Sequence, residues 1–200
     1  MDDDAHCLTE LRARDPDRWR VTLWSPAPTR KRLAALFALD LELARVVETT
    51  TEPMIGRIRL AWWRERLDAL ENGLPPAQPV LRALAQHWPG AGARLAALED
   101  GALAWADGEL DAAARERGTT LFALARDALG GGDPLTAGPA WAAGSMRRAG
   151  LLLAPVAPPR RLPRNLRPLL ALARLGNRDP HERADAPARQ LTIARTMILG

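Results

Sequence analysis

The chain has little of what β-sheets, disulfide bonds and membrane spans require. Its 200 residues include no tyrosine, two phenylalanines and one cysteine, Cys7. No stretch of alternating β-branched or aromatic residues predicts a strand. Cys7, in a segment that we expect to fray, cannot form an internal disulfide, so we expect a reducing compartment. No run reaches the roughly 18 consecutive apolar residues of a membrane-spanning helix.

Lysine is also scarce, because Lys31 is the only lysine among 28 basic residues. The net charge of +4 would suit nucleic acid. However, an arginine-, alanine- and leucine-rich composition is what a GC-rich genome produces without selection for binding. The sequence has neither a basic stripe interleaved with aromatic residues nor a zinc-finger spacing. We therefore expect no nucleic-acid partner.

The N-terminal residues and the chain length predict where the protein resides and how it is organised. The opening MDDDAHCLTE is acidic and lacks the basic-then-apolar order of a signal peptide. We expect a cytoplasmic protein made of a single domain over residues 1–200. A basic segment at 160–167, RRLPRNLR, follows the apolar LLLAPVAPP. Each arginine could gain about 1 kcal/mol at an anionic lipid surface, so peripheral contact with the inner membrane is a second expectation.

Helical periodicity recurs through the chain and predicts an all-α fold, a single helical bundle. Proline, glycine and capping residues set the expected helix boundaries. One helix begins at Arg30 after Thr29, and the next runs from Pro53 to Asn72-Gly73. The other expected helices cover residues 3–14, 78–88, 92–117, 119–129, 137–154, 163–175 and 186–199.

Residues 32–67 carry the most specific pattern in the chain. They include LFALDLELARV at 36–46 and EPMIGRIRLAWWR at 52–64, and PVLRAL follows at 79–84. This pattern resembles the squalene/phytoene synthase family, whose enzymes condense prenyl diphosphates head to head. In particular it resembles a short bacterial branch similar to the mitochondrial complex I assembly factor that has a phytoene-synthase domain.

The resemblance implies an isoprenoid-synthase fold with a central cavity. The candidate cavity residues are Phe37, Asp40, Ala44, Glu48, Arg59, Trp62, Trp63 and Arg64. Trp62 and Trp63 point about 100° apart on a helix, so at most one is central to the core. The other is either a rim residue or part of a groove for a prenyl chain or a partner helix. Arg59 and Arg64 could bind a diphosphate, although ion-paired or solvated arginines are the more ordinary interpretation.

The family's enzymes hold magnesium with carboxylates at i and i+4 on two facing helices, and this chain lacks both pairs. The first pair falls at Ala44 and Glu48, beside Arg45, which leaves one acid. Asp40 lies about 12 Å from Glu48 along the helix axis, too far to chelate the same ion. Between Asp133 and Asp179 there is no acidic residue and there are eight arginines. We therefore expect no bound magnesium and name no catalytic residue.

Two acidic features remain to be interpreted. Asp40 lies among apolar residues, and a buried carboxylate needs a partner. We favour an ion pair with Arg59 or Arg64, and a polar residue lining the cavity is the alternative. The single DxxxD, Asp107 and Asp111, lies away from the apolar stripe of its expected helix, so a solvated face is favoured over a metal site.

The sequence therefore predicts a catalytically silent family relative that acts as a binding or assembly factor. Its partner would be a protein, with respiratory complex I as a candidate, or an isoprenoid-like apolar ligand. The alternative is an active, magnesium-dependent prenyl transferase with a reorganised site. That site would use Glu48, Asp40, Asp107 and Asp111.

Overall fold

The computed structural model describes residues 2–72 and 77–200, and this part of the chain contains helices and no strands, as the sequence predicts. The elements follow one another as α1 (Asp3–Arg14), α2 (Pro16–Trp24), α3 (Ala27–Thr49), α4 (Pro53–Asp68), η1 (Ala69–Asn72), α5 (Pro79–His87), α6 (Gly92–Ala96), α7 (Leu98–Ala106), α8 (Leu110–Ala128), α9 (Ala137–Arg148), η2 (Arg164–Leu166), α10 (Arg167–Gly176) and α11 (Pro187–Leu199). In this part of the chain, no helix combines the length and apolarity that crossing a bilayer requires.

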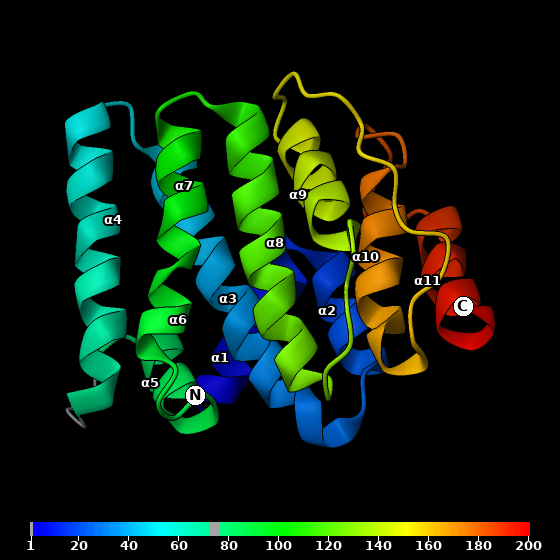
Figure 1. Ribbon diagram of the computed structural model, residues 1–200, viewed down its shortest axis with the longest axis horizontal. Coiled ribbons are helices and arrows are strands. Elements are labelled where there is room, and N and C mark those ends of the chain that lie inside the picture. Colours follow the sequence, from blue (N-terminus) through cyan, green and yellow to red (C-terminus); the bar gives the residue numbers. More distant parts are fainter. Residues whose placement is uncertain (1, 73–76) are drawn as a thin grey trace.

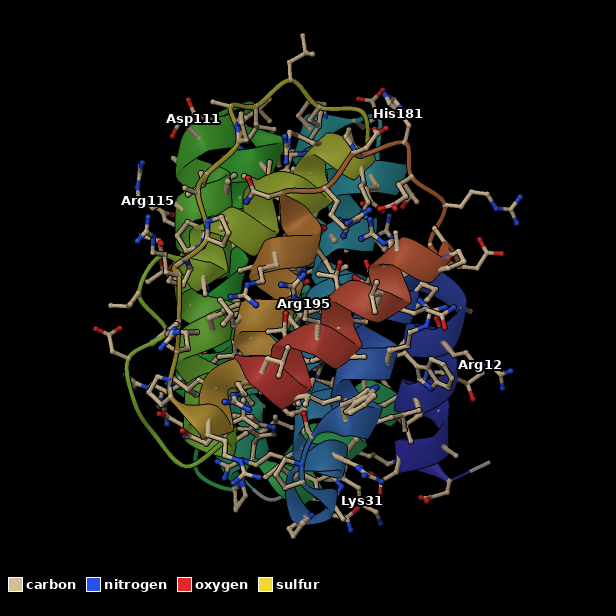
Figure 2. The ribbon with its side chains drawn as sticks, turned by 90° about the vertical axis from the view of Figure 1, so that its right-hand side faces the viewer. Arg12, Lys31, Asp111, Arg115, His181 and Arg195 are labelled. Carbon is tan, nitrogen blue, oxygen red and sulfur yellow. The ribbon has the colours of Figure 1, made fainter. Side chains whose placement is uncertain are left out.

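The helices form two layers (Figure 1). Helices α7, α8, α9 and α10 lie side by side in one layer, and α1, α2 and α3 lie behind them. Helix α4 stands at one edge of the bundle and contacts α3, α6 and α7. At the other edge, α11 packs on α10 and α2, and Figure 2 shows it crossing in front of them at Arg195.

Helix α3 is the centre of the core. All residues from Leu33 to Leu41 are buried, so this part of the helix is covered on every side. A helix that is buried all round must have neighbours on all faces. Accordingly, α3 contacts α1, α2, α4, α5, α7 and α8. Asp40 lies in this segment, which places a carboxylate at the middle of the molecule.

Two glycines let α8 and α9 approach closely. A Cβ atom on Gly118 would overlap the backbone of Gly138 and lie 2.6 Å from the nitrogen of Pro139. The two helices therefore touch backbone to backbone at this point. Their contact carries two large side chains, Arg117 on α8 and Trp141 on α9, toward the centre of the bundle.

Several helix boundaries differ from the prediction. Residues 16–24 form α2, a helix that was not predicted, and α3 begins at Ala27 and not at Arg30. Helix α4 ends at Asp68 and continues as the short η1 to Asn72, while the predicted stop at Gly73 lies outside the described residues. Helix α9 ends at Arg148, six residues before the predicted end.

The predicted helix over 92–117 is divided into three helices, and the predicted break after residue 117 does not occur. Gly108 adopts a φ of +81° between α7 and α8, a conformation that glycine reaches at little cost. Helix α8 then continues without interruption from Leu110 to Ala128. The side chain at 117 is consequently in the interior of a long helix.

Cys7 is also placed differently from the prediction. It is buried with 1% of its surface exposed, in a helix that begins at Asp3. Burial, with Asp4 and Asp3 nearby, raises the pKa of the Cys7 thiol to about 12. The N-terminal helix is held by ion pairs from Asp4 to Lys31 and from Asp3 to Arg82, which explains why this segment packs against the bundle.

Candidate functional site

A network of buried charges occupies the centre of the bundle. Asp40, which is 2% exposed, accepts two hydrogen bonds from Arg117, from Nε to Oδ1 at 2.7 Å and from Nη2 to Oδ2 at 2.7 Å. Arg18 donates a third bond from Nη1 to Oδ2, also at 2.7 Å. Two-pronged arginine–carboxylate contacts are among the strongest hydrogen bonds in proteins. Both carboxylate oxygens of Asp40 are therefore engaged by guanidinium groups.

The start of α2 fixes Arg18 in this network. Asp15 precedes the helix, and its Oδ1 accepts a hydrogen bond from the backbone N–H of Arg18 at 3.0 Å. Its other oxygen, Oδ2, accepts from Nε of Arg18 at 2.8 Å. Pro16 suits the first turn of a helix because it has no N–H to satisfy. The same local capping that starts α2 therefore also orients the Arg18 side chain toward Asp40.

Aromatic rings enclose the two arginines. The guanidinium carbons of Arg18 and Arg117 each lie 5.0 Å from the ring centre of Trp141. The ring of Phe37 lies 5.6 Å from Arg18, and that of Trp105 lies 5.6 Å from Arg117. A cation within about 6 Å of an aromatic face is stabilised by the ring's quadrupole. The rings therefore compensate part of the cost of burying two positive charges.

The arginines set the ionisation of Asp40. Burial opposes its charged form, but Arg117 and Arg18 outweigh burial and lower the pKa of Asp40 below its ordinary value of 3.8. Burial likewise opposes the ionised form of Asp15, whose pKa is nevertheless lowered by Arg18 and Arg148. Both carboxylates are therefore charged at neutral pH.

A pocket of about 260 Å³ opens beside the network. Ala44 and Glu48 of α3 line it, with Arg18 and Arg117 from the network. The Nη1 atom of Arg117 is buried and has no hydrogen-bond partner in the part of the chain that the structure describes. On the α9 side, Arg148 also lines the pocket. Burial lowers the pKa of Arg148, although Asp15 and Asp17 oppose this shift.

Helix α11 and the segment before it complete the pocket wall. Arg189 and Glu182 both line the pocket. Arg189 donates to Asp17 on α2 and also bonds Glu182 at 3.3 Å. Since Asp17 is buried, this ion pair fastens the last helix to the second one. Most of the residues that line the pocket are charged.

The residues present do not fit a magnesium site. Ala44 offers no side-chain oxygen atom, and both carboxylate oxygens of Asp40 are held by arginines. Magnesium requires oxygen ligands in near-octahedral geometry, whereas Arg18, Arg117 and Arg148 bring positive charge to this place. Across residues 2–72 and 77–200, no group of three or more His, Cys, Asp or Glu side chains could hold a metal ion.

The structure separates the candidate cavity residues into two groups. Asp40, Ala44 and Glu48 come together at the network and its pocket, where Phe37 is fully buried and its carbonyl oxygen accepts a 3.4 Å bond from Arg18. The candidates on α4 lie elsewhere, at the edge of the bundle (Figure 1). None of the α4 residues lines this pocket.

The predicted ion pair of Asp40 with Arg59 or Arg64 is wrong. Arg59 donates to the hydroxyl of Thr50 at 2.9 Å. Arg64 binds Glu99 and Asp100 on α7. Both arginines are used locally around α4, because that helix lies outside the layer that contains Asp40.

Two other expectations are confirmed. Trp63 is 5% exposed and belongs to the core, whereas Trp62 is 40% exposed and lies at the rim. Their rings meet edge to face with centres 5.3 Å apart. The side chains of Asp107 and Asp111 are solvated, and Asp107 pairs with Arg57 at 2.6 Å. The two aspartates do not share one helix, since Asp107 follows the end of α7 and Asp111 lies in α8.

Arg18 and Arg117, the residues that hold Asp40, are not among the site residues predicted from the sequence. For Arg18 a signal was present, because Asp15-Pro16 is a typical cap and first turn of a helix. For Arg117 the signal was weaker. It lies in register with the small and apolar residues Ala113, Ala114 and Leu121 on α8, where an arginine is unexpected. An arginine at such a position indicates a buried acidic partner.

The buried charge network lies partly inside and partly outside the segment of the chain that matches a known family. Residues 11–101 match the family model described as squalene/phytoene synthase. Over this segment, the chain is squalene/phytoene synthase-like. The matched segment contains Arg18, Asp40 and the pocket residues Ala44 and Glu48, whereas Arg117 and Arg148 lie beyond it. The acid and one arginine therefore come from the family segment, and the second arginine comes from the rest of the chain.

Curated relatives match over less than half of the chain. The bovine and human proteins named NADH dehydrogenase (ubiquinone) complex I, assembly factor 6 are each 36% identical over 77 residues, which is 38% of this chain. The rat protein of the same name is 35% identical over 83 residues, or 42% of this chain. The matches cover only about a quarter of these relatives' own length, 23% for the bovine and human proteins and 25% for the rat protein. No solved structure matches the chain.

Proposed function

We propose that this squalene/phytoene synthase-like chain is a non-catalytic binding or assembly factor. The observation that carries the proposal is the engagement of Asp40 by Arg18 and Arg117, at 2.7 Å each. An allylic diphosphate ionises when divalent cations neutralise the leaving group, and these cations need free carboxylates. In this chain the central carboxylate is committed to a structural network. Neither magnesium nor another cofactor is required by this function.

A protein partner is favoured over an isoprenoid-like ligand. The pocket beside the network is small, and its wall is mostly charged, which suits a prenyl tail poorly. The relatives with 35–36% identity are named as assembly factors of complex I. We therefore propose that the partner is a subunit or an assembly intermediate of respiratory complex I, met in the cytoplasm or at the inner membrane surface.

Deletion of the gene in its own host tests this assembly role. We expect the deletion to lower NADH:ubiquinone oxidoreductase activity in isolated membranes and to leave succinate dehydrogenase activity unchanged. A plasmid copy of the wild-type gene should restore the lost activity. Full complex I activity and normal subunit content in the deletion strain would contradict the proposal.

A further inference from the structure

Helix α4 presents an apolar stripe to solvent. Met54, Ile55, Ile58 and Trp62 are 70%, 51%, 63% and 40% exposed. Residues three, four, seven and eight positions apart lie on the same side of a helix, so these side chains form one surface, which we call the α4 stripe. It extends about 12 Å along the helix from Met54 to Trp62.

The α4 stripe is separate from the face by which α4 packs on the bundle. The packing face consists of Gly56, Leu60, Trp63 and Leu67, which are all buried. Helix α4 is therefore apolar on two sides, and the bundle covers only one of them. Since it stands at the edge of the molecule (Figure 1), the second side is accessible. A contiguous exposed apolar surface commonly marks a contact with another molecule.

The charges along the two edges of the α4 stripe differ. On one edge, Arg57 pairs with Asp107, and Arg64 pairs with Glu99 and Asp100, so positive charge is balanced. On the other edge lie Arg59 and Arg66.

Neither Arg59 nor Arg66 pairs with a carboxylate in the described part of the chain. Arg59 bonds the Thr50 hydroxyl, and the guanidinium of Arg66 lies 5.6 Å from the ring centre of Trp62. One edge of the α4 stripe is therefore positively charged. The exposed Glu65 lies at the C-terminal end of the stripe.

The charges along the two edges of the α4 stripe favour one kind of binding partner over two others. Two-fold pairing of two copies through antiparallel α4 helices would bring each arginine edge against its own copy, which is repulsive. An anionic membrane would meet the exposed carboxylates of Asp100 and Asp107 on the balanced edge. A helix that carries acids along one edge only would meet Arg59 and Arg66 with opposite charge and would avoid both conflicts.

We propose that the α4 stripe is the docking surface for an amphipathic helix of a partner protein, with carboxylates on the edge that faces Arg59 and Arg66. The proposal rests on the assembly function proposed above and specifies the chemistry of the partner. Helix-in-groove recognition uses apolar anchors at i, i+3 or i+4, and i+7. A stripe of this length takes about three such anchors, with the exposed ring of Trp62 at one end.

Two synthetic helical peptides test the charge specificity. Both carry the same leucine and isoleucine stripe, one with glutamates along one edge and the other with lysines at the same positions. Binding to the full chain is measured by fluorescence anisotropy at low and at physiological salt. We expect the glutamate peptide to bind at least about ten-fold more tightly, with the difference decreasing as salt rises. The double variant R59E/R66E should reverse the preference.

Matched variants locate the site. Ile58→Glu should abolish binding of the glutamate peptide. Leu152→Glu, at a leucine that is 93% exposed and far from α4 in sequence, should leave it unchanged. Both substitutions replace solvent-exposed side chains, and circular dichroism should show unaltered helix content. Equal binding of the two peptides, no binding of either, or full binding by the Ile58→Glu variant would overturn the proposal.

Two further measurements assign the surface if another occupant uses it. Sedimentation that shows a dimer lost on Ile58→Glu would replace the partner helix with a second copy of this chain. Flotation with anionic vesicles that depends on Ile58 would replace it with a membrane. Peptide selectivity combined with normal complex I activity in the deletion strain would keep the docking surface and reject the complex I role. Loss of peptide selectivity combined with reduced complex I activity in the deletion strain would reject the docking surface and keep the complex I role.

Discussion

At the scale of single residues, Asp40 determines what the centre of the protein can do. A lone buried carboxylate would be costly, and one that faced a cavity could bind a metal ion. In this chain its two oxygens accept three hydrogen bonds from Arg18 and Arg117. The carboxylate is therefore charged, satisfied and unavailable, and its contribution is to structure.

Removing the charge of Asp40 should destabilise the fold severely. Asp40→Asn removes the carboxylate that pairs with the buried Arg117 and leaves the buried Arg18 with Asp15 alone. Removing one partner of a buried ion pair costs about 3–5 kcal/mol. We expect this loss in the free energy of unfolding measured by urea denaturation. Asp107→Asn, at an exposed ion pair, should cost less than about 1 kcal/mol. A difference of less than about 1 kcal/mol between the two variants would contradict the structural role.

The same network predicts how stability depends on pH. The pKa of Asp40 is lowered in the folded state, so the unfolded chain binds its proton at higher pH than the folded chain does. The stability that ionised Asp40 contributes is therefore complete above a pH of about 4 and is lost as pH falls through the lowered pKa. Urea denaturation should be measured at several values between about pH 5 and about pH 2, a range that includes the ordinary pKa of aspartate. The free energy of unfolding should fall more steeply with decreasing pH for wild type than for Asp40→Asn. Parallel curves would indicate that Asp40 is not ion-paired.

At the scale of helices, the contact between α8 and α9 determines where Arg117 lies. Gly118 has no room for a side chain, because a Cβ would overlap the backbone of Gly138. Any residue other than glycine must push the two helices apart. That movement would carry Arg117 away from Asp40 and Trp141 away from both arginines.

Gly118→Ala should therefore destabilise the protein although alanine favours helices. Alanine gains about 1 kcal/mol in helix propensity over glycine, but overpacking costs about 1–3 kcal/mol or more. Gly56→Ala is the matched control, since its nearest neighbour would be a Thr50 methyl carbon at an ordinary 3.7 Å. We expect thermal unfolding to show a lower Tm for Gly118→Ala and an equal or higher Tm for Gly56→Ala. Equal Tm values for both would show that the close approach has no energetic consequence.

The helices also show which features of the fold can be predicted from sequence patterns. Periodicity predicted the all-helical fold, and that at most one of Trp62 and Trp63 is central to the core, because burial on one face leaves a repeat in the sequence. It failed for α2, which is short and has few apolar repeats, although Asp15-Pro16 marked its start. It also failed at Gly108, since a glycine within an apparently continuous stripe gives no indication of a positive φ.

The partner of Asp40 could not be obtained from local sequence. Arg117 lies 77 positions away and Arg18 lies 22 positions away. The neighbouring-helix candidates Arg59 and Arg64 are about as close to Asp40 in the chain as Arg18 is, but they lie at the edge of the bundle. Only the packing of α2, α3, α8 and α9 decides which arginines meet the carboxylate.

At the scale of the whole molecule, the family resemblance and the side chains at the centre of the bundle favour different functions. The matched segment, residues 11–101, is squalene/phytoene synthase-like. The remainder of the chain adds Arg117, Arg148 and Arg189 to the same central region. The bundle therefore brings arginines together at its centre, where a magnesium ion would require carboxylates.

Magnesium-dependent release of pyrophosphate from farnesyl and geranylgeranyl diphosphate tests the central claim most directly. The sample is the full chain, shown to be folded by its cooperative unfolding, and the positive control is an active squalene synthase. The account predicts release no faster than in buffer with magnesium alone, for both substrates and at every magnesium concentration. Enzyme-dependent release that requires magnesium and disappears in Glu48→Gln would contradict it.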